Sequence, residues 1–207
     1  MPPTRLLLVR HGETLWNQDG RFQGQTDVPL SEAGRRQAQA LRRVLAKELV
    51  QAAYSSDLCR AWETAQTCLQ GRDVVIAAEP RLRERCYGEW EGKTRQEVEL
   101  LTAGAASPPA TGDAEVVLRG GESWPQVQER VTVALREILS RHGGQTVVIV
   151  GHGGSLRALL IDQLGLPAET RRHLRTDNAG ISEIQTGPEG GYLVRWNDTH
   201  HLTAEPV

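Results

Sequence analysis

Two short apolar runs that each end at a histidine constrain the fold of this chain more than any other feature. The first, residues 6–9, is followed by Arg10-His11-Gly12, and the second, residues 146–150, by Gly151-His152-Gly153-Gly154. Apolar runs of this length are typical of buried strands. Polar residues at the end of a single strand often only contact solvent. Two strands that both end in a histidine beside glycine favour a shared function for the two histidines. Because ligands of α/β proteins bind beyond the carboxyl ends of the strands, we expect both histidines to face one pocket.

The rest of the chain alternates between strand-like and helix-like segments, which favours an α/β fold with a mostly parallel sheet covered on both faces. Apolar residues at Ala38, Leu41, Leu45 and Leu49 predict one face of a helix that starts after Ser31. Further helices are expected after a cap at Ser56 or Asp57, from the Ser123 to Gln126 capping box and from Ser155, with strands at 52–55, 74–77, 181–184 and 192–196. We expect one domain over residues 1–207, with an excursion at about 93–121 that partly covers the site.

Composition excludes several classes of protein. The net charge is −2, which gives no overall field to attract nucleic acid or an anionic membrane. No apolar stretch approaches the ~20 residues of a membrane span, and the first residues are too few and too proline-rich for a signal peptide, so a cytoplasmic protein is expected. The three cysteines are odd in number and lack metal spacing, which argues against a disulfide framework or structural zinc.

Two further charged side chains are candidates for the pocket. Arg60 falls in the first turn of a predicted helix, where a cation opposes the helix dipole by a few tenths of a kcal/mol unless an anion is bound there. On this pattern alone, a solvated surface arginine explains Arg60 equally well. Glu84 lies among arginines in a predicted loop, where a carboxylate can approach the same pocket. Because neither histidine belongs to a closely spaced ligand pair, the basic groups suit an anion better than a metal cation.

These residues resemble the histidine phosphatase superfamily, and specifically its phosphoglycerate mutase branch. The resemblance covers nearly the whole chain and is carried by Arg10-His11-Gly12-Glu13-Thr14, Trp16-Asn17, Gln23-Gly24, Ser55-Ser56-Asp57-Leu58 with Arg60-Ala61, Glu84 with Gly88, Gly120-Gly121-Glu122-Ser123, Gly151-His152-Gly153 and Asn197-Asp198-Thr199. It implies a three-layer α/β/α sandwich with a mostly parallel sheet. It also implies a reaction that proceeds through a phosphohistidine without metal or other cofactor.

The resemblance also implies roles for individual residues. His11 would be the nucleophile and Glu84 the proton donor, while Arg10, Arg60, His152 and Asn17 would hold the phosphoryl group; Gln23, Gly24 and Gly153 would line the substrate side. Guanidinium groups suit phosphate oxygens, and cationic neighbours keep an attacking imidazole neutral by lowering its pKa. We expect Arg83 and Arg85 to point away from the pocket, because they would oppose protonation of Glu84. The expected partner is a small phosphorylated metabolite, and a homodimer stays open.

Phosphatase and mutase activities differ in what receives the phosphoryl group, which is water in one and a second oxygen in the other. Family mutases usually carry a longer, more basic insertion after the catalytic glutamate. Here the bases of residues 93–121 are Lys93, Arg95 and Arg119, against four acidic residues. We therefore expect a phosphatase rather than a 2,3-bisphosphoglycerate-dependent phosphoglycerate mutase. A non-catalytic phospho-ligand sensor is disfavoured because both histidines and the glutamate are present. No pattern identifies the substrate.

Overall fold

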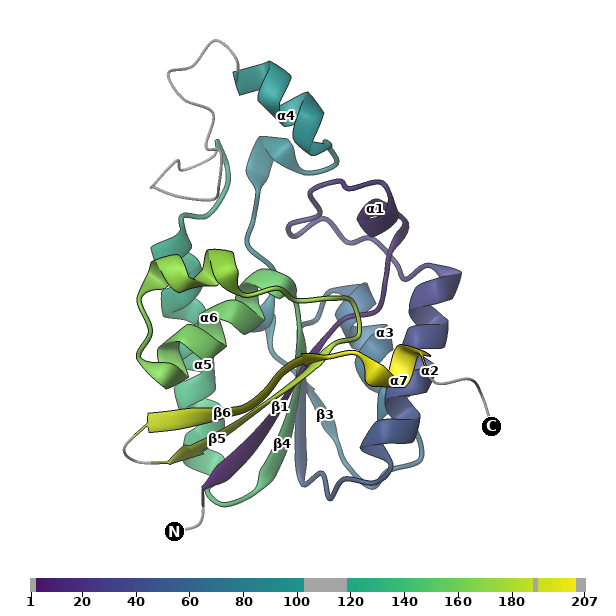
Figure 1. The fold of residues 1–207 in the computed structure, drawn as a ribbon, viewed down its shortest axis with the longest axis vertical. Coiled ribbons are helices and arrows are strands. Elements are labelled where there is room, and N and C mark those ends of the chain that lie inside the picture. The colour runs from purple at the N-terminus through teal and green to yellow at the C-terminus, as the bar shows by residue number, and fades with distance from the viewer. Residues whose placement is uncertain (1–2, 103–118, 188–189, 204–207) are drawn as a thin grey trace.

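A single six-stranded sheet organises the computed structural model, which describes residues 3–102, 119–187 and 190–203 (Figure 1). Its strand order is β3-β2-β4-β1-β5-β6. The strands are β1 (Thr4–Arg10), β2 (Ala52–Ser55), β3 (Ile76–Ala78), β4 (Thr146–Gly151), β5 (Ile181–Gly187) and β6 (Gly190–Asp198). The first four run parallel to one another, whereas β5 pairs antiparallel with β1 and β6 antiparallel with β5. The sheet is therefore mostly parallel, as predicted.

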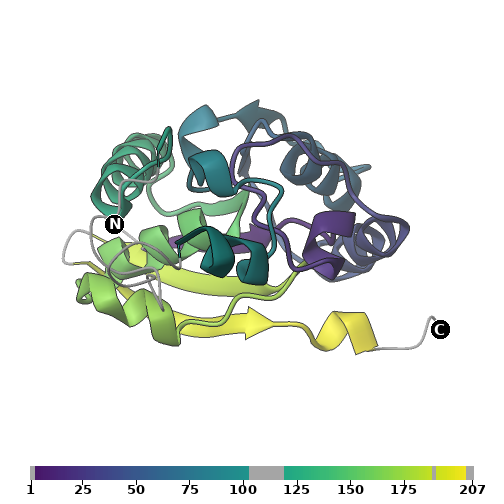
Figure 2. The same cartoon turned by 90° about the horizontal axis from the view of Figure 1, so that it is seen from above.

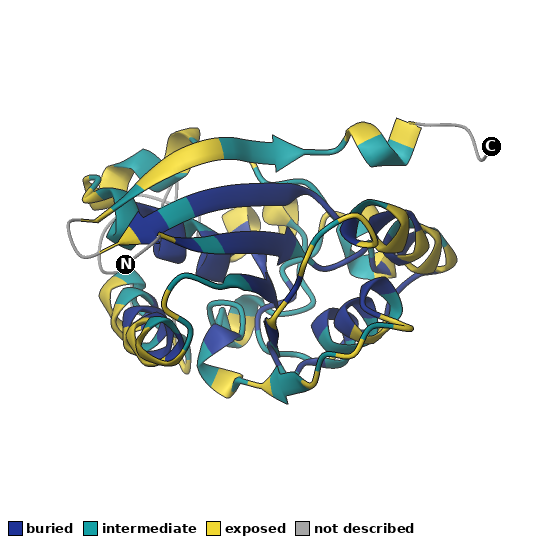
Figure 3. Ribbon diagram, turned by 90° about the horizontal axis from the view of Figure 1, so that it is seen from below, coloured by how far each residue is buried: buried dark blue, intermediate teal, exposed yellow. Residues whose placement is uncertain are grey.

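Helices cover both faces of the sheet (Figures 2 and 3). The α-helices are α1 (Leu15–Gln18), α2 (Glu32–Leu45), α3 (Cys59–Cys68), α4 (Arg95–Thr102), α5 (Trp124–Arg141), α6 (Gly153–Leu164) and α7 (His200–Thr203), and the 3₁₀ helices are η1 (Pro80–Leu82), η2 (Gly88–Trp90) and η3 (Ala168–His173). Helices α2 and α3 pack on one face and α5 and α6 on the other. This arrangement confirms the three-layer α/β/α sandwich.

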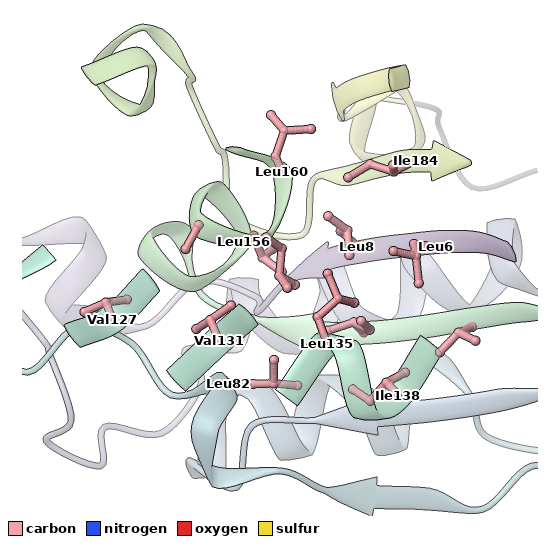
Figure 4. Close-up of a cluster of buried hydrophobic side chains, with 14 of the residues drawn as sticks. Leu6, Leu8, Leu82, Val127, Val131, Leu135, Ile138, Leu156, Leu160 and Ile184 are labelled. Atoms are coloured by element: carbon pink, nitrogen blue, oxygen red, sulfur yellow. The ribbon is translucent and has the colours of Figure 1, made fainter. Parts of the chain in front are cut away.

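The alternation of side chains along each strand creates one core on each face. In β1, Leu6 and Leu8 point toward α5 and α6, where they join Leu135 and Leu156 in one cluster (Figure 4). Leu7 and Val9 point the other way, into the core beneath α2 and α3. A strand that is buried on both sides must be apolar at every position, which is why the run that precedes His11 is continuous.

The structure confirms two predicted helix starts and corrects two local expectations. The Ser31 hydroxyl accepts a hydrogen bond from the Gly34 N–H, and Ser123 forms the predicted capping box with Gln126. Leu49 does not belong to the buried stripe, because α2 ends at Leu45 and the Leu49 side chain is 76% exposed.

The second correction concerns the start of α3. Neither Ser56 nor Asp57 is its N-cap, since the helix begins at Cys59 with Leu58 in the cap position and no side-chain cap. The Asp57 carboxylate instead pairs with Arg83. The predicted excursion at 93–121 lies partly outside the described residues. None of the helices that the structure describes has the length and apolar character needed to cross a bilayer.

Candidate active site

The two histidines come together because the strands that carry them are neighbours. Strands β1 and β4 pair in parallel with Arg10 opposite Gly151, so both runs end at the same edge of the sheet. The His11 N–H donates to the Gly151 carbonyl at 3.0 Å. The centres of the His11 and His152 rings lie 5.0 Å apart. The two rings lie together, as expected, but His11 lines the cavity described below whereas His152 does not.

The His11 ring is held in one orientation and one tautomer. Its side chain is buried, and Nδ1 lies 2.7 Å from the Gly12 carbonyl oxygen. A carbonyl only accepts, so Nδ1 carries the proton and Nε2 keeps its lone pair. Burial, followed by the positive charges of Arg60 and Arg10, lowers the pKa of His11 well below its usual value of 6.5. The ring is therefore neutral and able to act as a nucleophile at neutral pH.

The two predicted arginines surround this ring and are both held by backbone carbonyls. Arg60 is completely buried and donates to the carbonyls of Thr26 at 2.9 Å and Gly24 at 2.7 Å. This burial excludes the alternative that Arg60 is a solvated surface residue. Arg10 donates to the Thr176 carbonyl at 2.5 Å.

The cluster of cationic and imidazole groups retains unused donors. The Nε atoms of Arg10 and Arg60 are buried without a hydrogen-bond partner among the described residues, and so is Nδ1 of His152. Because a buried donor without a partner costs about 1–3 kcal/mol, this set of donors suits an anion.

Ser56 fixes the orientation of His152. The Ser56 hydroxyl oxygen accepts from the Leu58 N–H at 3.3 Å and lies 2.9 Å from Nε2 of His152. This contact fixes the plane of the His152 ring. Burial and the charge of Arg60 lower the pKa of His152 well below 6.5. His152 is thus a neutral imidazole beside His11.

Glu84 meets the first turn of α6. Its carboxylate accepts from the Gly154 N–H at 3.1 and 3.0 Å and from the Arg85 N–H at 2.8 Å. A Cβ atom at position 154 would lie 2.1 Å from Oε1 of Glu84, so a larger residue there would displace this carboxylate. Arg83 pairs with Asp57, and Nε of Arg85 donates to the Glu122 carbonyl at 2.7 Å. Neither arginine lines the cavity, in agreement with the expectation.

A cavity of about 210 Å³ joins these groups. Eight of the nine predicted site residues line it, namely Arg10, His11, Asn17, Gln23, Gly24, Arg60, Glu84 and Gly153. The ninth, His152, is completely buried beside His11. Sequence reasoning missed the other lining residues, which are Arg21, Phe22, Tyr87, Arg157 and Thr176. Only the place of Arg157 in the first turns of the predicted helix after Ser155 was a usable signal.

A network around Asn17 and Asn178 supports the loop that follows His11. The Asn17 side-chain oxygen accepts from the Thr14 N–H and from Nδ2 of Asn178, both at 3.1 Å. With its oxygen occupied, Asn17 has its amide N–H groups left for the cavity. Nδ2 of Asn178 also lies within hydrogen-bond distance of the carbonyls of His11 and Gly12, at 3.1 and 3.3 Å. Sequence reasoning did not identify Asn178 in this role.

Comparisons with known proteins agree with this geometry. The model of the histidine phosphatase superfamily, branch 1, matches residues 6–199. The chain is 34% identical to phosphoserine phosphatase 1 of Hydrogenobacter thermophilus, over 96% of this chain and 94% of that protein. It is 35% identical to a metal-independent phosphoserine phosphatase of Arabidopsis thaliana, over 97% and 84% of the two chains. Other relatives at similar identity are named as probable phosphoglycerate mutases, one of them from Cronobacter sakazakii at 36%.

Solved structures give the same result. A mycobacterial glucosyl-3-phosphoglycerate phosphatase in complex with VO3 matches with a TM-score of 0.85 and 33% identity, over 94% of this chain and 99% of that one. The family match spans nearly the whole chain, and phosphatases recur among the relatives and the solved structures. The chain therefore belongs to branch 1 of the histidine phosphatase superfamily and is a phosphomonoesterase of that family.

Proposed function

We propose that this phosphomonoesterase acts on small metabolites through a phosphohistidine formed on His11. The observation that carries the proposal is the His11 ring itself, whose Nδ1 proton is bound to the Gly12 carbonyl so that Nε2 is free to attack. The buried Nε–H groups of Arg10 and Arg60 have no partner among the described residues and suit the oxygens of a phosphoryl group. Guanidinium groups stabilise the negative charge of these oxygens most strongly in a buried site.

In the proposed first step, Nε2 of His11 forms a bond to phosphorus while the bond from phosphorus to the leaving oxygen breaks. Glu84 gives its proton to that oxygen, so an alcohol leaves. General acid catalysis of this kind is commonly worth about 10²- to 10⁴-fold in rate. In the second step, Glu84 takes a proton from water, whose oxygen attacks the phosphohistidine. Inorganic phosphate leaves, and neutral His11 is restored.

The surroundings of Glu84 suit a group that exchanges a proton at the leaving oxygen. Its carboxylate accepts from the Gly154 N–H, which both of its oxygens share, and from the Arg85 N–H. These backbone contacts hold the carboxylate at the cavity that His11 also lines. We therefore assign both proton transfers to Glu84.

Trapping of the intermediate tests the proposal. After brief turnover and quenching without acid, peptide mapping by mass spectrometry is expected to find phosphate on His11 and none in a His11→Asn variant. Phosphate on His152 would contradict the assigned roles. Incubation with 3-phosphoglycerate and 2,3-bisphosphoglycerate tests the mutase alternative, and the expected product is inorganic phosphate rather than the isomer.

We further propose that the leaving group carries a carboxylate, as in phosphoserine. The relatives named for phosphoserine support this class. Arg157 supports it as well, since its Nε is buried without a partner among the described residues and its side chain lines the cavity beside Thr176. Because a hydrogen bond to a charged group contributes about 1.5–3 kcal/mol, Arg157→Met should reduce kcat/KM for phosphoserine by about 10- to 100-fold. For phosphoethanolamine, which has no carboxylate, kcat/KM should be the same for the wild type and for Arg157→Met.

A further inference from the structure

We infer that Arg130 is a positioning residue that acts through Glu84, by fixing the loop that carries this proton donor. The inference rests on the proposed role of Glu84. Residues 79–93, here called the Glu84 loop, contain the 3₁₀ helices η1 and η2 and follow the short strand β3. The backbone of this loop pairs with Phe22 at Gly92 and Lys93, but residues 81–85 belong to no strand of the described sheet. The position of Glu84 must therefore be set by side chains from neighbouring elements.

Arg130 projects from α5 onto this loop and binds three of its carbonyl groups. Its Nη1 donates to the carbonyls of Arg81 at 2.6 Å and Arg83 at 2.8 Å, and its Nη2 donates to that of Glu84 at 2.9 Å. These contacts lie directly before and at the proton donor. Arg130 itself is not among the residues that line the cavity, so it has no direct access to a substrate bound there.

The remaining donors of Arg130 bind Glu122. Nε donates to one carboxylate oxygen at 2.7 Å, and Nη2 donates to the other at 2.9 Å. A guanidinium has five N–H groups, and these five hydrogen bonds use all of them. The two side chains are only 18% and 21% exposed. The carboxylate also neutralises the guanidinium, so that the pair adds no net charge beside Glu84.

Glu122 extends the same support to the other side of Glu84. Its carboxylate accepts from the Cys86 N–H at 2.8 Å, and its own N–H donates to the Cys86 carbonyl at 2.9 Å. Its carbonyl accepts from Nε of Arg85 at 2.7 Å. Hydrogen bonds thus fix the backbone of the loop before, at and after Glu84, and the Gly154 N–H donates to the Glu84 carboxylate itself. This gives the Gly120-Gly121-Glu122-Ser123 motif a role that its sequence does not reveal.

The proposed role predicts a selective loss of activity. A proton donor that is displaced by about 1 Å can lose about 10²-fold in rate. The loss should appear with an alkyl phosphate, whose leaving oxygen needs a proton, and not with p-nitrophenyl phosphate, whose leaving group needs little protonation. A lysine has three donors on one nitrogen and cannot reproduce five bonds to a planar set of acceptors. Arg130→Lys should therefore fail to restore the function.

The experiment compares kcat/KM on glycerol 3-phosphate and p-nitrophenyl phosphate for Arg130→Met, Arg130→Lys and Glu84→Gln. Arg136, which is exposed on the same helix, provides the matched control as Arg136→Met. We expect both Arg130 variants to lose at least about tenfold on the alkyl ester and less than about threefold on the aryl ester. Glu84→Gln should show the same pattern with a larger loss, and the control should behave as the wild type.

A double variant decides whether Arg130 acts through Glu84. If it does, Arg130→Met should cause little further loss on the alkyl ester when Glu84 is already glutamine. Equal losses on both substrates for the Arg130 variants, with a selective loss for Glu84→Gln, would overturn the inference and leave the proposed function intact. An equal loss for Glu84→Gln itself would overturn both. If Arg130→Met does not fold, Glu122→Gln replaces it, with the same pattern expected at smaller amplitude.

Discussion

Mild acidification should destabilise the fold steeply, because two buried histidines are neutral in the native state. The pKa values of His11 and His152 both lie well below 6.5, mainly through burial and then through the charge of Arg60. In the unfolded chain each ring takes up a proton near pH 6.5. Below that pH the unfolded state binds more protons than the native state. Stability is therefore complete above pH 6.5 and is lost as the pH falls below it.

The size of the effect follows from the number of protons. Each extra proton in the unfolded state changes the free energy of unfolding by about 1.4 kcal/mol per pH unit, so two histidines give about 2.7. Between pH 7.5 and 5.0 the loss reaches about 4 kcal/mol while both native rings stay neutral, which is a large part of the 5–15 kcal/mol typical of a domain. His201, whose pKa is also lowered by burial, adds in the same direction. Carboxylates contribute little in this window because their ordinary pKa values are near 4.

Urea unfolding at pH values between 5.0 and 7.5 measures this slope directly. His11→Asn and His152→Asn should each reduce it by about 1.4 kcal/mol per pH unit. The matched control is His173→Asn, since His173 is exposed, and its slope should equal that of the wild type. If the slope is unchanged in both site variants, the two rings are not neutral in the native protein and the argument for a neutral nucleophile is wrong.

Three other predictions concern the reaction. Exhaustive chelation should leave turnover intact, and a loss that only a divalent ion restores would contradict the mechanism. Gly154→Ala should displace the Glu84 carboxylate, because its Cβ would lie 2.1 Å from Oε1, and should lower activity on alkyl phosphates far more than on p-nitrophenyl phosphate. Asn178→Ala should reduce kcat by about tenfold or more with little change in melting temperature, because the amide supports the carbonyl that orients His11; a normal kcat would exclude that role.

The features that could be predicted from sequence are those with a local cause. The continuous apolar runs identify central strands because both faces of β1 and β4 are buried. The Ser123 capping box depends on residues three apart and marks the start of α5 correctly. The prediction that Leu49 belongs to the buried face of α2 was wrong because the apolar pattern continues past Leu45, where the helix ends.

The rest depends on contacts between distant parts of the chain. The burial of Arg60 requires the carbonyls of Gly24 and Thr26 to close over it, and no pattern around position 60 reveals them. Thr176 and Asn178 reach the site because β5 pairs with β1, a contact across more than half of the sequence. Such residues carry no local signal, so the place of Thr176 and Asn178 in the candidate site could not be predicted from the sequence.

The position of β1 in the middle of the sheet has a consequence for folding. Leu6 lies between Val147 on one side and Ile184 on the other, so β1 has to wait for partners that are synthesised more than 140 residues later. Contacts of such long range slow folding, and apolar strands exposed meanwhile are prone to aggregate. The reactive imidazole at the end of β1 gains its pocket only when these late strands arrive. Nascent chains are therefore expected to be inactive and to depend on chaperones until β4 and β5 have been synthesised.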